Sequence, residues 1–232
     1  MKILKYFVVL AGLLLVACSK DNYVAPSITL KGRIVYGGEP LNLEYSQVGM
    51  QLWDPGWGKL APIDVTVSQE GTFSSLLFAG KYKLIIPKGQ GPFMTKAQQG
   101  SSSDTLYVDL KDNQNIDIEV TPYYLVRNAK FANEAGVISS TFDLSKVITD
   151  ANAKNIERVS LYINKTQFVA GSTNIAATNL TGANITNLTG IKMSVNVPTI
   201  NPDQNYVYAR VGLKIAGVED MIFSPIQKIQ YK

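Results

Sequence analysis

The chain has 232 residues, a formal net charge of +4, one cysteine and no histidine. Without histidine it cannot build a Ser-His-Asp triad, a Cys-His pair or a His-ligated zinc or haem site, and one cysteine cannot form an internal disulfide. The sequence has no basic run or stripe, so we expect no nucleic-acid partner.

The first residues have the pattern of a secretory signal peptide. Lys2 and Lys5 precede an apolar run over residues 6–16, which is too short to span a bilayer because a transmembrane helix needs about 20 residues. The run leads into Leu-Val-Ala-Cys, ending at Cys18. This resembles the lipobox of bacterial lipoproteins, in which a small residue precedes a cysteine that is lipidated before the signal is cut. The alternative is an ordinary signal peptide with a stray cysteine.

The lipobox resemblance implies a protein anchored to a membrane. Residues 1–17 are then removed, Cys18 carries acyl chains and residues 18–26 form a tether. A serine follows the cysteine in place of the aspartate that suggests retention in the inner membrane. Lys20 and Asp21 resemble the surface-export signal of Bacteroidota lipoproteins. We expect lipid anchoring in the outer membrane on the cell surface, with its periplasmic face as the alternative.

Residues 27–121 contain short runs in which apolar and polar side chains alternate, separated by turn-forming residues. Such runs predict strands, and their spacing favours a sandwich or barrel over an α/β fold. The predicted strands are Ile28–Leu30, Val48–Leu52, Ile63–Val67, Tyr82–Ile86, Leu106–Leu110 and Ile116–Val120.

A second set of strands follows Pro122, which closes the first set. These strands are Ser139–Leu144, Val159–Ile163, Met193–Val197, Val207–Ile215 and Ile226–Ile229. Residues 143–158 have a helix-like pattern, and the Ser-, Thr-, Asn- and Gly-rich residues 172–190 predict a long loop or a ragged hairpin. We therefore predict an all-β fold with two tandem β-sandwich domains, 27–121 and 122–232, each with a core of its own.

The segment LWDPGWGK, residues 52–59, holds both tryptophans. Trp53 points away from the strand face that carries Met50 and Leu52, whereas Trp57 follows Pro-Gly at a loop tip or folds back over the end of the sandwich. An indole can stack on the apolar face of a sugar, but burying it to close a small sandwich also stabilises the fold by several kcal/mol. Both residues are candidate ligand contacts. We interpret Trp53 as mainly structural and leave both roles open for Trp57.

Tyr206, Tyr208 and Arg210 share one face of a predicted strand whose other face is apolar. This phase predicts a solvent-side ladder of aromatic and cationic side chains that could stack on a sugar and hydrogen-bond it. The alternative is that the tyrosines lie flat against the Arg and Lys stems, or that this face is buried against the first domain.

The carboxylates suggest no catalytic or metal site. Asp117 and Glu119 face the same way on a predicted strand, whereas a glycosidase needs its two carboxylates across a cleft, so we interpret them as a solvated strand face. The acidic and amide residues between 109 and 117 lack the spacing of an EF-hand loop. We expect no catalytic residue, no metal ligand and no cofactor.

The first strand set resembles the carboxypeptidase regulatory-like (transthyretin-related) sandwich. The resemblance is carried by Gly32–Val35, Val48–Leu52, Gln69–Phe73 and Phe78–Leu84, because in that family an acidic-Gly-x-Phe turn precedes a Gly-x-Tyr strand. The Tyr206–Val211 strand is similar to one in fibronectin type III or immunoglobulin-like sandwiches. The first resemblance implies a domain without catalytic residues.

With Asp21–Tyr23, Gly91–Phe93 and Val120–Tyr123 added, the chain from Cys18 onward resembles a Bacteroidota lipoprotein family, domain-of-unknown-function family 3823. Its members are typically encoded beside outer-membrane glycan-import systems of the starch-utilisation type. This implies a non-catalytic lipoprotein that binds a polysaccharide or oligosaccharide, or that assists an outer-membrane transporter complex. The alternative is a structural or adhesin-type accessory lipoprotein that acts through protein contacts, and an enzyme is not expected.

Overall fold

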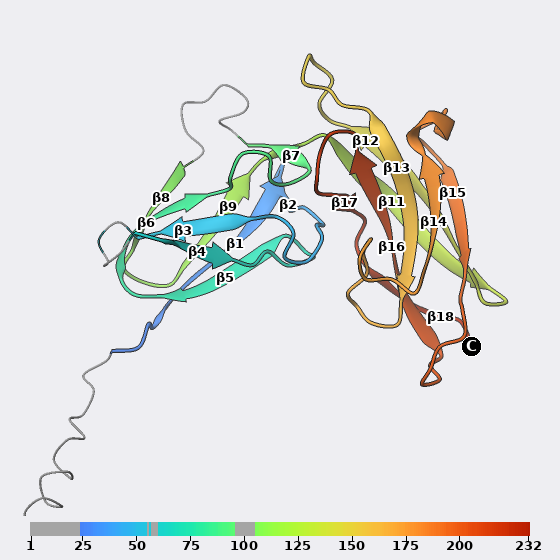
Figure 1. Ribbon diagram of the computed structural model, residues 1–232, viewed down its shortest axis with the longest axis horizontal. Helices are drawn as coiled ribbons and strands as arrows, with labels where there is room; N and C mark the ends of the chain where they lie inside the picture. The colour runs from blue at the N-terminus through green and yellow to red at the C-terminus, as the bar shows by residue number, and fades with distance from the viewer. Residues whose placement is uncertain (1–23, 55, 57–59, 96–104) are drawn as a thin grey trace, which may run out of the picture.

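The computed structural model describes residues 24–54, 56, 60–95 and 105–232. These residues form strands β1 to β18 and one 3-10 helix, η1 (Gly182–Asn184). They make two β-sandwich domains that lie side by side, the first coloured blue to green and the second yellow-green to red (Figure 1). The predicted all-β fold with two domains is confirmed. In this part of the chain, no helix is long and apolar enough to cross a membrane.

The first domain contains two four-stranded sheets. In the β1 sheet the order is β2-β1-β5, and β9 pairs in parallel with the other side of β1. In the β3 sheet the order is β4-β3-β6-β8. The bounds are β1 (Ile28–Tyr36), β2 (Glu39–Pro40), β3 (Met50–Trp53), β4 (Pro62–Val65), β5 (Thr72–Leu77), β6 (Gly80–Ile85), β8 (Thr105–Leu110) and β9 (Gln114–Glu119).

The second domain contains a three-stranded and a five-stranded sheet. The β12 sheet has the order β11-β12-β15, and the β16 sheet has the order β14-β13-β16, with β17 and β18 both pairing with β16. The bounds are β11 (Tyr124–Glu134), β12 (Val137–Lys146), β13 (Ile156–Asn164), β14 (Ala176–Thr181), β15 (Ile191–Asn196), β16 (Tyr206–Ile215), β17 (Ile222–Phe223) and β18 (Gln227–Gln230). A two-stranded ribbon of β7 (Phe93–Met94) and β10 (Thr121–Pro122) lies at the domain boundary.

Strand β1 shows how the sequence sets the two faces of its sheet. Leu30 and Ile34 are fully buried, whereas Lys31 is exposed and Arg33 is half-buried, as the period of two requires. Between them, Gly32 is needed because a Cβ there would come within 2.4 Å of the Phe73 ring. The apolar face therefore enters the core and the polar face is left outside.

The prediction of a helix from the pattern over residues 143–158 is wrong. The segment is the end of β12, a turn and the start of β13. Asp150 forms the turn, since its Oδ1 accepts a hydrogen bond from the Asn152 N–H at 2.8 Å. Leu144 and Ile148 are both buried, one on the strand and one in the connection, so their helical spacing has a non-helical origin.

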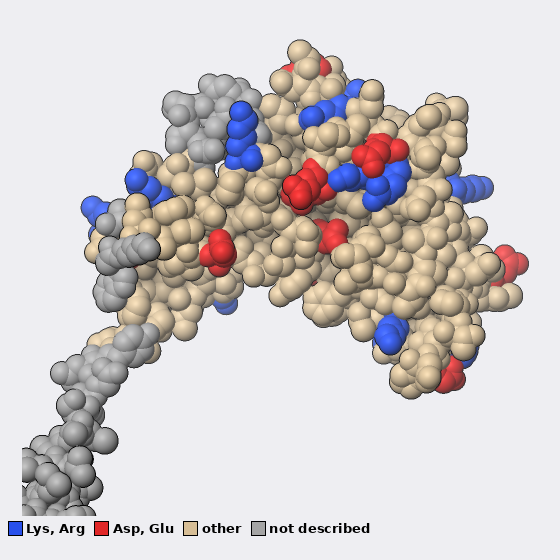
Figure 2. All heavy atoms as spheres, viewed as in Figure 1, with Lys and Arg blue, Asp and Glu red and all other residues tan. Residues whose placement is uncertain are grey.

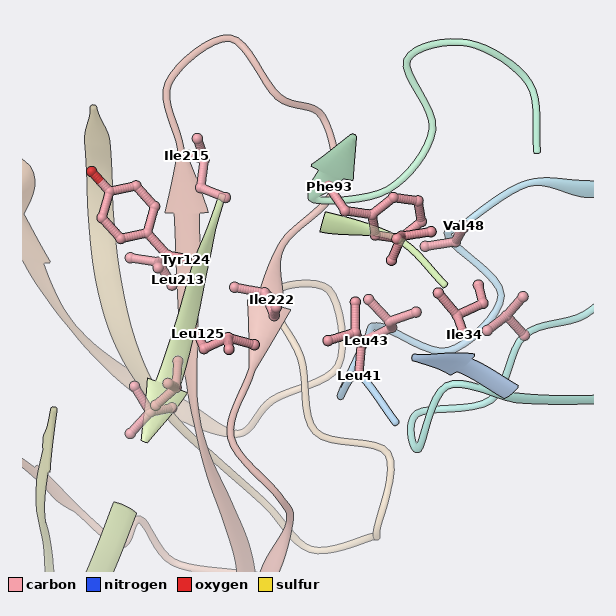
Figure 3. Packing of buried hydrophobic residues seen from close by; sticks show 14 of the residues in the cluster. Ile34, Leu41, Leu43, Val48, Phe93, Tyr124, Leu125, Leu213, Ile215 and Ile222 are labelled. Carbon is pink, nitrogen blue, oxygen red and sulfur yellow. The ribbon is translucent and has the colours of Figure 1, made fainter. Parts of the chain in front are cut away.

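The buried apolar side chains of the two domains form one continuous cluster. Leu41 and Leu43 of the first domain approach Ile222 of the second (Figure 3). Beside them, the Phe223 N–H donates a hydrogen bond to the Asn42 carbonyl at 3.0 Å. The expectation of separate cores is corrected in one respect: each domain has its own sheets, but the two sandwich interiors are joined across the boundary near residue 122.

Charged side chains are interspersed on the face of the molecule drawn in Figure 2. Cations and carboxylates alternate there and do not gather by sign. Among the described residues, one ion pair joins the domains, that of Arg127 with Glu39 at 2.6 Å. Such an exposed pair adds little stability. The contact between the domains therefore depends mainly on the buried seam, which is the contact of Leu41, Asn42 and Leu43 with Ile222 and Phe223.

Candidate functional site

Trp53 belongs to a row of side chains on the outer face of the β3 sheet. It lies opposite Pro62 on β4 and Lys83 on β6, and Tyr107 on β8 continues the row. Lys83 Nζ lies 5.8 Å from the centre of the Tyr107 ring. The indole is half-buried and its Nε1 has no hydrogen-bond partner among the described residues. This burial is consistent with a mainly structural Trp53, whereas Trp57 lies outside the described residues.

The predicted ladder on β16 has two different ends: Tyr206 and Tyr208 are partly exposed, whereas Arg210 is buried. Tyr206 and Tyr208 are half-buried and meet edge to face, with ring centres 5.8 Å apart. Lys228, opposite Tyr208 on β18, places its Nζ 3.7 Å from the centre of the Tyr206 ring. The ammonium occupies a ring face on which a sugar could stack. This is the alternative arrangement, in which a tyrosine packs against a lysine.

The prediction that Arg210 faces solvent is wrong. Its side chain is completely buried against the first domain, where Nη2 donates to the Leu43 carbonyl at 3.1 Å and Nη1 donates to Gln69 Oε1 at 3.2 Å. The guanidinium carbon lies 4.0 Å from the centre of the Phe223 ring. Burial lowers the pKa of Arg210 to about 9, which leaves the group charged at neutral pH. Because the first domain covers this half of the strand face, Arg210 cannot reach a ligand.

A groove lies on the outer face of the β1 sheet. Its volume of about 460 Å³ is in the range of small-ligand pockets. An aromatic ring, Tyr45, lines the groove together with hydroxyl, amide and cationic groups, and none of the described lining residues carries a carboxylate. Its polar residues include Lys31, Arg33, Ser68, Thr72, Ser74 and Asn115.

Tyr45 is held in place by the second domain. Its ring is 48% exposed and meets Phe168 edge to face, with ring centres 5.3 Å apart. The loop that carries Phe168 is fixed in turn, because Asn164 Nδ2 donates to the Phe168 carbonyl at 2.6 Å and Gln69 Nε2 donates to the Gln167 carbonyl at 3.2 Å. The exposed ring is therefore positioned before any ligand arrives.

One cross-strand row of the groove, the Arg33 row, is satisfied internally. Arg33 lies between Asp117 on β9 and Thr72 on β5. Its Nε donates to Asp117 Oδ1 at 2.9 Å and its Nη2 donates to Oδ2 at 2.5 Å, and this bonding lowers the pKa of the Asp117 carboxyl. The Thr72 hydroxyl pairs with that of Ser68 at 2.9 Å.

The neighbouring row, the Lys31 row, is open. Lys31 lies between Asn115 on β9 and Ser74 on β5, and all three line the groove. Among the described residues, none of these three side chains takes part in an ion pair or a side-chain hydrogen bond. Their ammonium, amide and hydroxyl groups are available to a ligand.

A second hollow, of about 540 Å³, lies beside β12, β14 and β15. Serines and threonines supply most of its polar groups, and no aromatic ring lines it among the described residues. Nor do the described residues contain a group of three or more acidic, His or Cys side chains placed to hold a metal ion. The groove on the β1 sheet is the better candidate site because it alone of these two hollows offers an aromatic face.

Neither Tyr45 nor Phe168 was predicted from the sequence. The two rings come from loops of different domains, and no local pattern pairs them. Lys31 and Arg33 do carry a signal, because they alternate with buried apolar residues along one strand and so share the outward face.

Family models match both domains. The model for the N-terminal domain of the DUF3823 family of proteins of unknown function matches residues 28–121. The model for the domain of unknown function DUF3823_C matches residues 124–228. No curated protein gives a significant match to the chain.

Solved structures resemble the chain over most of its length. A DUF3823 family protein from Parabacteroides merdae is 30% identical with a TM-score of 0.75, and the match covers 89% of this chain and 100% of that one. A second, from Bacteroides ovatus, is 29% identical with the same TM-score and coverage. A protein from Bacteroides uniformis that has been proposed to bind carbohydrate is 15% identical with a TM-score of 0.67, covering 88% of this chain and 99% of that one. At that identity the likeness shows the fold alone.

Proposed function

The chain belongs to the DUF3823 family, and from this premise we propose that it is a non-catalytic lipoprotein of the outer membrane that binds glycan in the groove of its first domain. The observation that carries the proposal is the exposed Tyr45 ring set among hydrogen-bonding side chains in a hollow of about 460 Å³. A sugar presents an apolar C–H face and a rim of hydroxyls. One flat aromatic face with polar neighbours matches both, since stacking covers the apolar face while the neighbours satisfy the hydroxyls.

Preorganisation supports the same proposal. The edge-to-face contact with Phe168 orients the Tyr45 ring, and the strands of the β1 sheet fix the backbone positions from which the polar side chains project. Little conformational entropy is then lost when a ligand binds, which favours affinity in an open site. The proposed carbohydrate binding of the Bacteroides uniformis protein with this fold points in the same direction.

The expected experiment is a binding screen of the full chain against a panel of neutral and acidic oligosaccharides, followed by Tyr45→Ala. Losing the stacking face should weaken saturable binding roughly tenfold or more. Tyr107→Ala is the matched control, because Tyr107 is an even more exposed tyrosine of the same domain that lies on the other sheet, at 72% exposure. Equal loss in both variants would remove the groove as the site.

The accessory alternative is tested by the same screen. A lipoprotein that acts only through protein contacts shows no saturable binding to any glycan of the panel. That result would replace the proposed function with the structural or adhesin-type role.

The membrane anchor is proposed from the signal and lipobox pattern that ends at Cys18. We expect a fatty-acid probe to label the wild-type chain in cells, and Cys18→Ala to leave an unlabelled precursor or soluble product, because the acceptor thiol is gone. Cys18→Ser serves as a control that preserves size. Label on either variant would contradict the lipoprotein assignment.

A further inference from the structure

We infer that the groove selects glycans that carry a carboxylate, and that the Lys31 row binds this carboxylate while the sugar ring lies against Tyr45. The inference rests on the proposed function and adds the class of ligand. It comes from the contrast between the two neighbouring rows of the β1 sheet. Arg33 is already paired with a carboxylate of the protein, whereas Lys31 has no ion pair among the described residues.

The balance of donors and acceptors in the groove favours an anion. Lys31 and Asn115 contribute an ammonium with three N–H donors and an amide with two. The described lining residues include no carboxylate, so the side-chain acceptors that they offer to a sugar hydroxyl are uncharged, namely the Asn115 amide oxygen and hydroxyl oxygens. A ligand that brings its own acceptors, as a carboxylate does, fits this surplus of donors.

The Arg33 row does not supply the anion site. Arg33 Nε and Nη2 are both used by Asp117, whose negative charge also offsets the guanidinium. The Thr72 hydroxyl is likewise paired within the protein. An anion placed here would compete with an existing carboxylate and would be repelled by it.

The Lys31 row has no such competitor. Lys31, Asn115 and Ser74 stand side by side on three adjacent strands, which lie about 4.8 Å apart. This spacing lets the ammonium of one strand and a donor of the next bind the two oxygens of one carboxylate. Because these groups lie on a rigid sheet and have no partners among the described residues, binding breaks no interaction of the protein.

The test compares each acidic oligosaccharide with its own methyl ester, which removes the carboxylate charge, adds one methyl group and keeps the sugar rings. Short uronate oligosaccharides of pectin, alginate and glycosaminoglycan type are titrated into the full chain at 0.15 M salt, where the Debye length is about 8 Å and distant charges are screened. At least one acid should bind about tenfold more tightly than its ester, which is the size of effect expected for one charge-assisted contact.

Lysine variants assign this preference to the row. Lys31→Met should abolish the preference for the acid, and Lys31→Arg, which keeps the charge, should retain it. Lys81→Met is the matched control, since Lys81 is an exposed strand lysine of the same domain outside the groove. A preference unchanged in Lys31→Met would overturn the inference.

The remaining outcomes separate the inference from the proposed function. Glycan binding that depends on Tyr45 but is equal for acids and esters, or confined to neutral sugars, would overturn the acidic ligand and leave the function standing. No saturable binding to any glycan would overturn both.

Discussion

Arg33 and Arg210 both lie on internal strands, one in each domain, but have opposite environments. Each lies on the outer, polar face of an internal strand, with hydrogen-bonded strands on both sides. The side chain of Arg33 is 40% exposed and paired with a carboxylate, whereas Arg210 is completely buried and bonded to a carbonyl and an amide oxygen. The polar face of a strand is thus a solvent surface in one domain and a domain interface in the other.

The difference between the two arginines lies in what covers each strand face. At the seam, the first domain covers β16, and the buried Arg210 is held by hydrogen bonds from Nη1 and Nη2, whereas its Nε has no partner among the described residues. Leaving more of these buried groups unpaired would be costly. On the β1 sheet nothing among the described residues covers the Lys31 row, so its polar groups are available to a ligand. The seam therefore stabilises the arrangement of the domains, whereas the groove leaves its polar side chains accessible to a ligand.

The largest expected effect is that of Arg210→Ala. The substitution removes the Arg210 donor from the Leu43 and Val169 carbonyls, leaves Gln69 Oε1 with the Val169 N–H as its donor among the described residues, and removes the contact with the Phe223 ring. We expect the free energy of unfolding to fall by about 3 kcal/mol or more, measured by chemical denaturation. A loss no greater than that in Arg33→Ala would contradict the distinction between the two regions.

Gln69→Ala should have the next largest effect. The buried Gln69 side chain accepts from Val169 N–H and donates to the Gln167 carbonyl, so it joins the loop of the second domain to the first domain. We expect a loss of about 1 to 3 kcal/mol in the same denaturation experiment. Gln47→Ala, at an exposed glutamine of the first domain, is the control and should leave the midpoint unchanged.

Asp220→Asn should have a smaller effect that depends on pH. Burial raises the pKa of Asp220, whose Oδ2 accepts a hydrogen bond from the Gly91 N–H at 2.6 Å. Because the folded pKa lies above the unfolded value of about 3.9, this group contributes stability below about pH 4 and loses it as the pH rises through the folded pKa. The melting temperature of Asp220→Asn relative to wild type should therefore rise between pH 4 and pH 7. A constant difference would show that the carboxyl is not penalised by burial.

The smallest effect on stability is expected for Arg33→Met. Its ion pair with Asp117 is exposed, and exposed pairs contribute little. The melting temperature should stay close to that of wild type, whereas affinity for acidic oligosaccharides should fall, because Asp117 then stands uncompensated beside the Lys31 row. Calorimetry and ligand titration on the same sample check the two readouts, and retained affinity would mean that Asp117 does not influence the groove.

The strands with regular alternation were readable from the sequence, and those whose pattern is interrupted were not. β16 was predicted because Val207, Ala209 and Val211 repeat with period two. The first half of β11 is apolar at Tyr124, Leu125 and Val126 without alternation, since these residues lie at the domain boundary and are buried on both sides. β14 was contained in the segment interpreted as a loop or ragged hairpin, because its side chains are small and polar.

The candidate site was only partly readable for a related reason. The outward phase of Lys31 and Arg33 follows from their own strand, but which of them keeps a free charge depends on β9. That strand pairs with β1 from a distant part of the chain and places Asp117 opposite Arg33. The Tyr45 ring needs a loop of the other domain to position it.

The sequence by itself determined the all-β class, the two sets of strands and the phase of each regular strand, because period two depends only on neighbouring residues. It also determined which chemistry is excluded, since a chain without histidine cannot supply an imidazole. The tertiary structure alone decided that the Arg210 side chain lies in a buried seam while the Lys31 side chain lies in an open groove. Both are polar positions on an outer strand face, and only the packing of one domain on the other determines which of them water can reach.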